Sequence, residues 1–204
     1  MKLIKDKFDK KDIQTLPKVL FDGRIFIVLN ESEADRAVDY LLRQSVLGFD
    51  TETRPSFRRG HINKVALLQV ATATTCFLFR LNRIGLPDSI LRLLEDVRIT
   101  KVGLSLKDDF HNLRQRRDFT PGHFIELQNE VQLLGIEDMS LQKIYANLFA
   151  QRISKTQQLT NWEADTLTQA QQLYAATDAW ACLNIHAEVM RLQQTGDYQL
   201  LTSP

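Results

Sequence analysis

The sequence SVLGFDTE, residues 45–52, places two carboxylates directly behind an apolar run. The run predicts a β-strand, and on a strand the side chains of Asp50 and Glu52 point to the same face. They stand at the carboxyl end of that strand, where open α/β sheets place their ligands. Like charges this close repel each other unless a cation lies between them. Taken alone, the pattern is also typical of two solvated acids at a strand exit.

A second acidic pair, Asp108 and Asp109, follows the apolar sequence VGLSL, residues 102–106. This sequence predicts a buried strand that leads directly into a helix. Negative charge is favoured at a helix N-terminus, so an ordinary helix cap also explains either acid.

A third polar placement lies in LYAATDAWA, residues 173–181, within a long predicted helix. Tyr174 and Asp178 are four residues apart and therefore share one helix face. The small residues Ala175 and Ala181 allow the helix to approach a sheet closely, which would bring Asp178 near Asp50. A polar stripe that faces solvent is the alternative interpretation.

Acids at a strand end, a helix start and a helix face can meet at one point in a mixed α/β domain. Such a cluster of oxygen ligands suits two hard divalent cations, and we expect Mg²⁺ or Mn²⁺. Two such ions stabilise an in-line displacement at phosphorus. The chain has 26 basic and 25 acidic residues. This balance argues against a protein that coats nucleic acid through a large positive excess, and ions would supply the missing charge.

The composition predicts one soluble domain of ordinary make-up, with 204 residues, 44% of them hydrophobic and 25% charged. No run approaches the roughly 20 apolar residues of a membrane helix, and the N-terminus lacks the apolar segment of a secretory signal. Cys76 and Cys182 have no metal-ligand spacing and form no disulfide scaffold. We therefore expect a cytoplasmic protein without membrane contact.

Hydrophobic periodicity divides the chain into alternating strands and helices, which predicts a mixed sheet covered by helices. We interpret residues 1–20 as an N-terminal arm and 21–204 as a single domain. Strands are predicted at 24–29, 45–52, 64–72, 74–79, 100–106 and 123–127. Helices are predicted from 32, at 87–97, from 107–109, at 139–149 and at 166–194, with a loop at 150–163.

Three motifs in this order give the chain a specific resemblance to a known family. LGFDTE with the following KVALLQV, then VGLSLKDDFHNL, then NWEADTLTQAQQLYAATDAWA resemble the motifs of the DEDD superfamily of 3′→5′ exonucleases, in its tyrosine branch. The chain looks closest to the Werner-type exonuclease domain, and ribonuclease D is a more distant relative. The resemblance implies a ribonuclease H-like fold, with a five-stranded mixed sheet in the order 3-2-1-4-5 and strand 2 antiparallel. The strand at 24–29 would be an additional edge strand.

The resemblance also implies a role for each acid. Asp50 would bridge two metal ions, and Glu52 and Asp178 would complete the site of the ion that holds the attacking water. In the second motif the alignment selects Asp109, not Asp108, as the ligand of the other ion. The implied reaction is hydrolysis of the terminal phosphodiester at a free 3′ end, with release of a 5′-mononucleotide.

Tyr174 matches the family's tyrosine that hydrogen-bonds the attacking water, whereas the sister branch has a histidine at the position of Leu173. A tyrosine has an ordinary pKa near 10 and is a poor base at neutral pH. We therefore expect Tyr174 mainly to orient the water, with proton acceptance as a secondary possibility.

Basic and aromatic residues near the motifs are candidate contacts to nucleic acid, although each cation is also typical of solvated surface. Phe57 and Trp162 are candidates for stacking on bases, and a tryptophan in this setting is more often part of the core. The candidate phosphate contacts are Arg54, Arg58, Arg59, Lys64, Arg152 and Lys155.

The identity of the nucleic acid stays open at this point. The Werner-type similarity favours DNA. An RNA 3′-end trimmer of the ribonuclease D kind is the alternative, because no motif reports contacts to a 2′-hydroxyl. A catalytically inactive nucleic-acid-binding module is a further alternative, although all four acids and the tyrosine are present.

Overall fold

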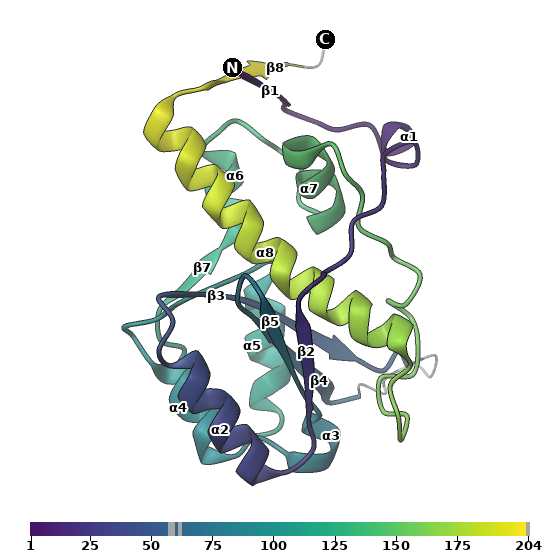
Figure 1. The fold of residues 1–204 in the computed structure, drawn as a ribbon, viewed down its shortest axis with the longest axis vertical. Coiled ribbons are helices and arrows are strands. Elements are labelled where there is room, and N and C mark those ends of the chain that lie inside the picture. The colour runs from purple at the N-terminus through teal and green to yellow at the C-terminus, as the bar shows by residue number, and fades with distance from the viewer. Residues whose placement is uncertain (57–59, 61–62, 203–204) are drawn as a thin grey trace.

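A mixed sheet of six strands forms the centre of the molecule, for which a computed structural model describes residues 1–56, 60 and 63–202 (Figure 1). The strands lie in the order β2 (Arg24–Val28), β5 (Thr75–Phe79), β4 (Val65–Ala71), β3 (Val46–Thr53), β6 (Thr100–Gly103) and β7 (Phe124–Glu126). β4 is antiparallel to β3 and β5, and the other pairs are parallel. This confirms the predicted ribonuclease H-like order, and β2 adds a sixth strand at the β5 edge.

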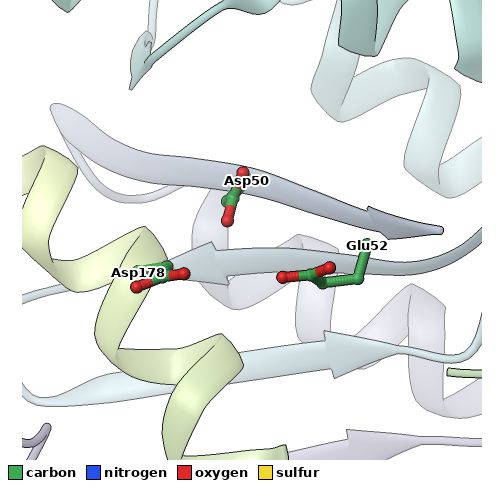
Figure 2. Close-up of side chains that lie close together, drawn as sticks. All are labelled: Asp50, Glu52 and Asp178. Atoms are coloured by element: carbon green, nitrogen blue, oxygen red, sulfur yellow. The ribbon is translucent and has the colours of Figure 1, made fainter. Parts of the chain in front are cut away.

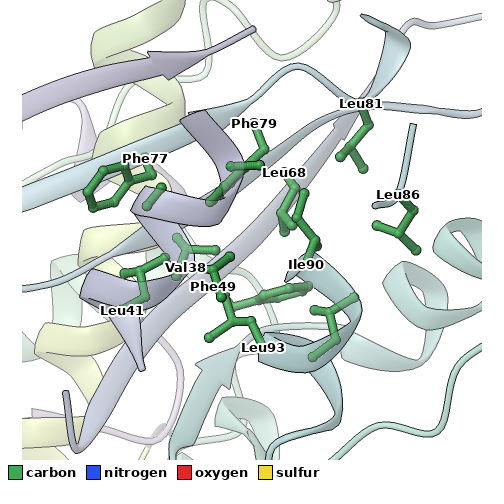
Figure 3. Close-up of a cluster of buried hydrophobic side chains, with 14 of the residues drawn as sticks. Val38, Leu41, Phe49, Leu68, Phe77, Phe79, Leu81, Leu86, Ile90 and Leu93 are labelled. Atoms are coloured by element: carbon green, nitrogen blue, oxygen red, sulfur yellow. The ribbon is translucent and has the colours of Figure 1, made fainter. Parts of the chain in front are cut away.

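One face of the sheet is covered by the helices α2 (Glu31–Leu41) and α4 (Asp88–Glu95), which enclose a hydrophobic core (Figure 3). Leu41 of α2 and Leu93 of α4 are buried there together with Phe49 of β3. Because side chains alternate along a strand, Asp50 must point to the opposite face of the sheet.

The opposite face is crossed by the long helix α8 (Gln169–Thr195) (Figure 1). α8 begins with a capping box between Thr168 and Gln171 and ends at Gly196, whose φ of 63° suits glycine. It lies so close to β3 that a Cβ on Gly48 would be 1.9 Å from the carbonyl oxygen of Ala179. The predicted close approach of this helix to the sheet is therefore present. None of the described helices, α8 included, is both long and apolar enough to span a membrane.

In the described part of the chain, five shorter helices connect and support these layers. The predictions at 107–109 and 139–149 correspond to α5 and α7, whereas α1, α3 and α6 were not predicted because four to six residues are too few to show a helical period. Their bounds are α1 (Lys10–Ile13), α3 (Leu81–Ile84), α5 (Leu106–Arg114), α6 (Leu127–Gln132) and α7 (Leu141–Phe149).

The N-terminal segment is attached to the far end of the chain. β1 (Lys2–Lys5) pairs in parallel with β8 (Tyr198–Leu201), so the first and the last described strands lie side by side (Figure 1). Ile4 is buried against α8, and the side-chain amide of Asn147 bonds both backbone groups of Lys5 at 2.9 and 2.7 Å. Residues 1–20, interpreted above as an arm, thus pack along α7 and the loop behind it.

Candidate metal centre

Three of the predicted acids meet on the α8 face of the sheet. Asp50 and Glu52 of β3 and Asp178 of α8 each have a carboxylate oxygen within 4.8 Å of the others (Figure 2). β3 supplies two of them because residues i and i+2 share a face. The third is within reach because glycine and alanine line the contact between β3 and α8.

Burial makes this cluster electrostatically unfavourable without a cation. It raises the pKa of Asp50 to about 7. Burial, then the charges of Asp50 and Asp178, raises the pKa of Glu52 to about 10. Burial and Asp50 also raise the pKa of Asp178 well above its usual range, and Asp178 Oδ1 is buried without a hydrogen-bond partner among the described residues. An unpaired buried oxygen beside two further carboxylates is the donor set that a hard divalent cation requires.

The fourth predicted acid, Asp109, lies next to this cluster and not in it. Its carboxylate accepts a hydrogen bond from the hydroxyl of Thr51, which precedes Glu52 in β3. Burial and the charge of Asp50 raise the pKa of Asp109 well above its usual range. Asp108, the acid that the alignment rejected, is exposed.

The N-terminus of α5 is capped by a residue that the sequence interpretation missed. The Glu126 carboxylate accepts hydrogen bonds from the backbone N–H groups of Ser105 and Leu106, at 3.0 and 2.8 Å. Ser105 has a φ of 63°, and β6 ends before it at Gly103, so the predicted strand at 100–106 was too long. Because Glu126 of β7 caps α5, Asp109 is not needed as the cap and is available beside the cluster. No local sequence pattern indicates that Glu126 would contact the start of α5.

Tyr174 stands one helical turn before Asp178 on α8 and is 7% exposed. Burial, followed by the charges of Asp178 and Glu52, holds the pKa of the Tyr174 phenol well above its usual range. Its ring packs against Trp162, with the ring centroids 5.9 Å apart. The phenol is therefore neutral at physiological pH and fixed in place.

The three acids and Tyr174 line a cleft of about 360 Å³. The other walls come from the β6–α5 connection, from the start of α7, and from the loop at 150–163, which supplies Lys155 and Gln158. The charge of Lys155 lowers the pKa of Asp178, so this cation lies in the field of the cluster. The cleft has room for a small ligand beside the carboxylates.

The predicted contacts to nucleic acid are distributed unevenly around the cleft. Lys155 lines it, whereas Arg54 forms an ion pair with Glu163 at 3.3 Å. The Nε of Arg152 donates to the carbonyl of Leu16 at 3.0 Å. The remaining residues are Lys64, which is exposed and directly precedes β4, and Phe57, Arg58 and Arg59, which lie outside the described residues.

Trp162 requires a correction. Its side chain is 0% exposed and belongs to the core beneath α8, where it supports Tyr174. A ring that is enclosed on all sides cannot stack on a base, so the structure assigns Trp162 to packing and not to a nucleic-acid surface.

Comparison with known proteins gives consistent matches. A family model described as 3′-5′ exonuclease matches residues 25–193. The mouse bifunctional 3′-5′ exonuclease/ATP-dependent helicase WRN is 30% identical over 190 residues, which make up 88% of this chain and 14% of that protein. The chain thus spans only a small part of this relative.

Solved structures share the fold at low sequence identity. The Aedes aegypti Nibbler EXO domain has a TM-score of 0.76 and 18% identity, with 86% of this chain and 91% of that chain covered. Escherichia coli RNase D, an exoribonuclease involved in structured RNA processing, has a TM-score of 0.75 and 20% identity, with coverage of 83% and 45%.

Proposed function

Because this chain belongs to the 3′-5′ exonuclease family of the DEDD superfamily, we propose that its cleft hydrolyses the terminal phosphodiester of a DNA strand and releases a 5′-mononucleotide. The chain is an exonuclease and hence a hydrolase of nucleic acid with a 3′ end, and the enzymes of this family use divalent metal ions. The observation that carries the finer proposal is the group of three carboxylates, half-buried at Asp50 and buried at Glu52 and Asp178, in which one oxygen of Asp178 has no partner among the described residues.

We assign the metal-holding role to four acids. Asp50, Glu52 and Asp178 would hold one ion, and Asp50 with Asp109 would hold a second, for which we propose Mg²⁺ or Mn²⁺. When bound, such ions neutralise the phosphate and make water a stronger nucleophile. Oxygen donors without a thiolate or imidazole suit these two metals.

The protein groups then orient the reactants. Tyr174, in the tyrosine position of the family, hydrogen-bonds the attacking water and aligns it with the bond to be broken. The water adds its oxygen to phosphorus while the bond from phosphorus to the O3′ of the preceding nucleotide breaks. That O3′ takes up a proton in place of the one that the water loses, so the shortened strand again carries a 3′-hydroxyl.

We propose DNA before RNA because the chain is 30% identical to the mouse exonuclease–helicase and 20% identical to RNase D. RNA is the second candidate, because the RNase D fold extends over 83% of this chain. Among the predicted cations that the structure describes, Lys155 is the one that lines the cleft, and we assign it to a phosphate of the substrate. Arg54, Lys64 and Arg152 would contribute from the periphery.

One assay tests the proposal and separates its alternatives. A 5′-labelled oligonucleotide of one sequence is supplied as single-stranded DNA, as recessed-duplex DNA and as RNA, with Mg²⁺, with Mn²⁺ or with EDTA. We expect a ladder from the 3′ end and 5′-mononucleotides as product, fastest on DNA, with no cleavage in EDTA or by Asp50→Ala. Preference for RNA would select the second candidate. Metal-dependent binding without cleavage would reject both.

A further inference from the structure

A second hollow of about 390 Å³ lies beside the metal cleft, between the N-terminal segment and the loop at 150–163. Lys10 and Gln14 form one side of it, and residues 152–156 form the other. Gln142 at the start of α7 and Lys155 line both this hollow and the cleft of the acids, so the two spaces meet at these side chains. The hollow therefore adjoins the cleft of the acids.

The N-terminal wall of this hollow is firmly built. The backbone of Arg152 accepts a hydrogen bond from the N–H of Val19 at 3.0 Å and donates one to the carbonyl of Pro17 at 2.9 Å. The side chain of Asp9 caps α1, and Ile13 of α1 is buried. These contacts hold Lys10 at a defined place opposite the loop.

The hollow is positively charged. Lys10, Arg152 and Lys155 line it, and no acidic residue is among its described lining residues. Neither Lys10 nor Lys155 forms an ion pair within the described part of the chain. Unpaired ammonium groups in a groove that leads to a nuclease site have the chemistry to bind phosphodiesters.

We propose that this hollow binds the single strand upstream of the terminal nucleotide, with Lys10 and Lys155 at successive backbone phosphates. The inference rests on the proposed function, because it takes the acid cleft as the position of the 3′ end. It gives residues 1–20 a role that the sequence did not suggest. The N-terminal segment completes the substrate-binding surface.

The test compares two neighbouring lysines of α1. Lys10→Glu alters the hollow, whereas Lys11→Glu makes the same charge change on the same helix outside the described lining of the hollow. KM is measured for a dinucleotide and for a 12-mer with the same 3′ end, together with the affinity of a 5′-fluorescein 12-mer in EDTA. We expect Lys10→Glu to raise the KM of the 12-mer relative to the KM of the dinucleotide about fivefold. The slope of log affinity for the 12-mer against log salt concentration should become shallower by about 0.7. Lys10→Arg, which keeps the positive charge, should leave both quantities at their wild-type values.

Equal effects of Lys10→Glu and Lys11→Glu would overturn the proposal, as would an unchanged KM ratio. The affinity of the 12-mer in EDTA is measured without cleavage, so it tests the hollow separately from the proposed nuclease activity. Failure of the wild-type protein to cleave any substrate would count against the nuclease, while a difference between the two variants in 12-mer affinity would still support the hollow.

An independent observation concerns Gln69 in β4. Its side chain is 0% exposed, and neither Nε2 nor Oε1 has a hydrogen-bond partner among the described residues. A buried amide without a partner lowers the free energy of unfolding.

Gln69 lies beside the proposed bridging ligand. It pairs directly with Asp50 across the antiparallel β3–β4 ladder, so the two side chains share the face that α8 covers. Directly opposed residues have Cβ atoms about 5 Å apart, which is within the reach of a glutamine amide.

We infer that Gln69 is a positioning residue, whose amide N–H donates to the Asp50 carboxylate when the metals are bound. This inference also rests on the proposed metal site. A hydrogen bond of this kind fixes the orientation of a ligand and typically changes metal affinity or activity by about 10–100-fold.

Gln69→Met tests the inference because it keeps the side-chain length and removes the amide. We expect the metal-free variant to melt about 2–4 °C above wild type, while the Mg²⁺ concentration for half-maximal activity rises and kcat falls about tenfold. The matched control is Thr75→Val on β5, which removes a buried hydroxyl that, like the Gln69 amide, has no partner among the described residues. It should raise the melting temperature without altering kcat or the Mg²⁺ dependence.

Two results would overturn this second inference. One is a Gln69→Met variant with the kinetics and Mg²⁺ dependence of Thr75→Val. The other is a lower melting temperature of the metal-free Gln69→Met protein, which would show that the amide already has a partner in the free chain.

Discussion

The hydroxyl of Thr51, which lies between Asp50 and Glu52 in β3, donates a hydrogen bond to the carboxylate of Asp109. Asp109 is therefore satisfied in the metal-free protein, while the three other acids crowd one another. Metal binding at the proposed second position must compete with Thr51 for this carboxylate.

Thr51→Val tests this competition. The variant leaves a half-buried carboxylate without its donor, so we expect the metal-free protein to lose about 1–2 kcal/mol of unfolding free energy. Saturating Mg²⁺ should recover part of the loss, because an ion can satisfy Asp109 in place of the hydroxyl. Urea unfolding with and without Mg²⁺ measures both values, and Thr51→Ser, which keeps the hydroxyl, is the control. A loss of equal size in both conditions would show that Asp109 stays on Thr51 in the loaded enzyme.

The acid cluster also predicts how stability depends on pH and metal. The pKa of Asp50 is about 7 in the folded chain and 3.8 ordinarily. Between these values the folded state binds more protons than the unfolded state, so the stability of the metal-free protein falls as pH rises through this window. Asp50→Asn removes the charge. We expect the metal-free variant to be more stable than wild type at pH 8 by roughly 2 kcal/mol, and similar near pH 4.

Thermal melts at both pH values, with and without Mg²⁺, check this prediction. Mg²⁺ should raise the melting temperature of wild type and leave that of Asp50→Asn unchanged, because the bridging ligand is lost. The exposed Asp108→Asn serves as the control and should behave like wild type. A metal-free Asp50→Asn protein less stable than wild type at pH 8 would contradict the electrostatic account.

The sheet and the position of its acids were predictable because they depend on local patterns. Period-two alternation and apolar runs identify the strands, and a carboxylate pair two residues apart can only share a face, as Asp50 and Glu52 do. The small residues of α8 likewise indicated its close approach to the sheet, which brings Asp178 to β3.

The features that were missed depend on contacts between distant segments. β1 and β8 are four residues each, and they pair although Lys2 and Tyr198 lie at opposite ends of the chain. Glu126 caps a helix that begins 20 residues earlier. No spacing within either segment signals such partners. Trp162 was placed among the candidate contacts by its position near a motif, and only its burial decides its role.

The contact between the two ends of the chain has its own pH dependence. Arg191, followed by Lys2 of β1, lowers the pKa of Glu188 on α8 to about 2, from an ordinary value of 4.5. A depressed carboxylate pKa contributes stability above pH 4.5, and this contribution is lost as pH falls through about 2. We expect Glu188→Gln to cost about 1 kcal/mol at pH 7 and less at pH 3, by urea unfolding. Glu137→Gln, which breaks only the exposed pair with Lys7, should cost little at either pH. An equal cost of Glu188→Gln at pH 7 and pH 3 would show that the ion pairs contribute nothing.

A change at Tyr174 should affect turnover without affecting the binding of metal or substrate. Its phenol is neutral and packed against Trp162, one turn from Asp178, so its proposed task is to orient the water and not to hold a metal. We expect Tyr174→Phe to lower kcat about 100-fold, while the Mg²⁺-induced rise in melting temperature and the KM of a 12-mer stay close to wild type. Tyr145→Phe removes a comparably buried hydroxyl on α7 outside the described cleft lining and should leave kcat unchanged. Full turnover by Tyr174→Phe would remove the tyrosine from the reaction. Loss of the Mg²⁺-induced stabilisation would instead place its hydroxyl among the groups that build the metal site.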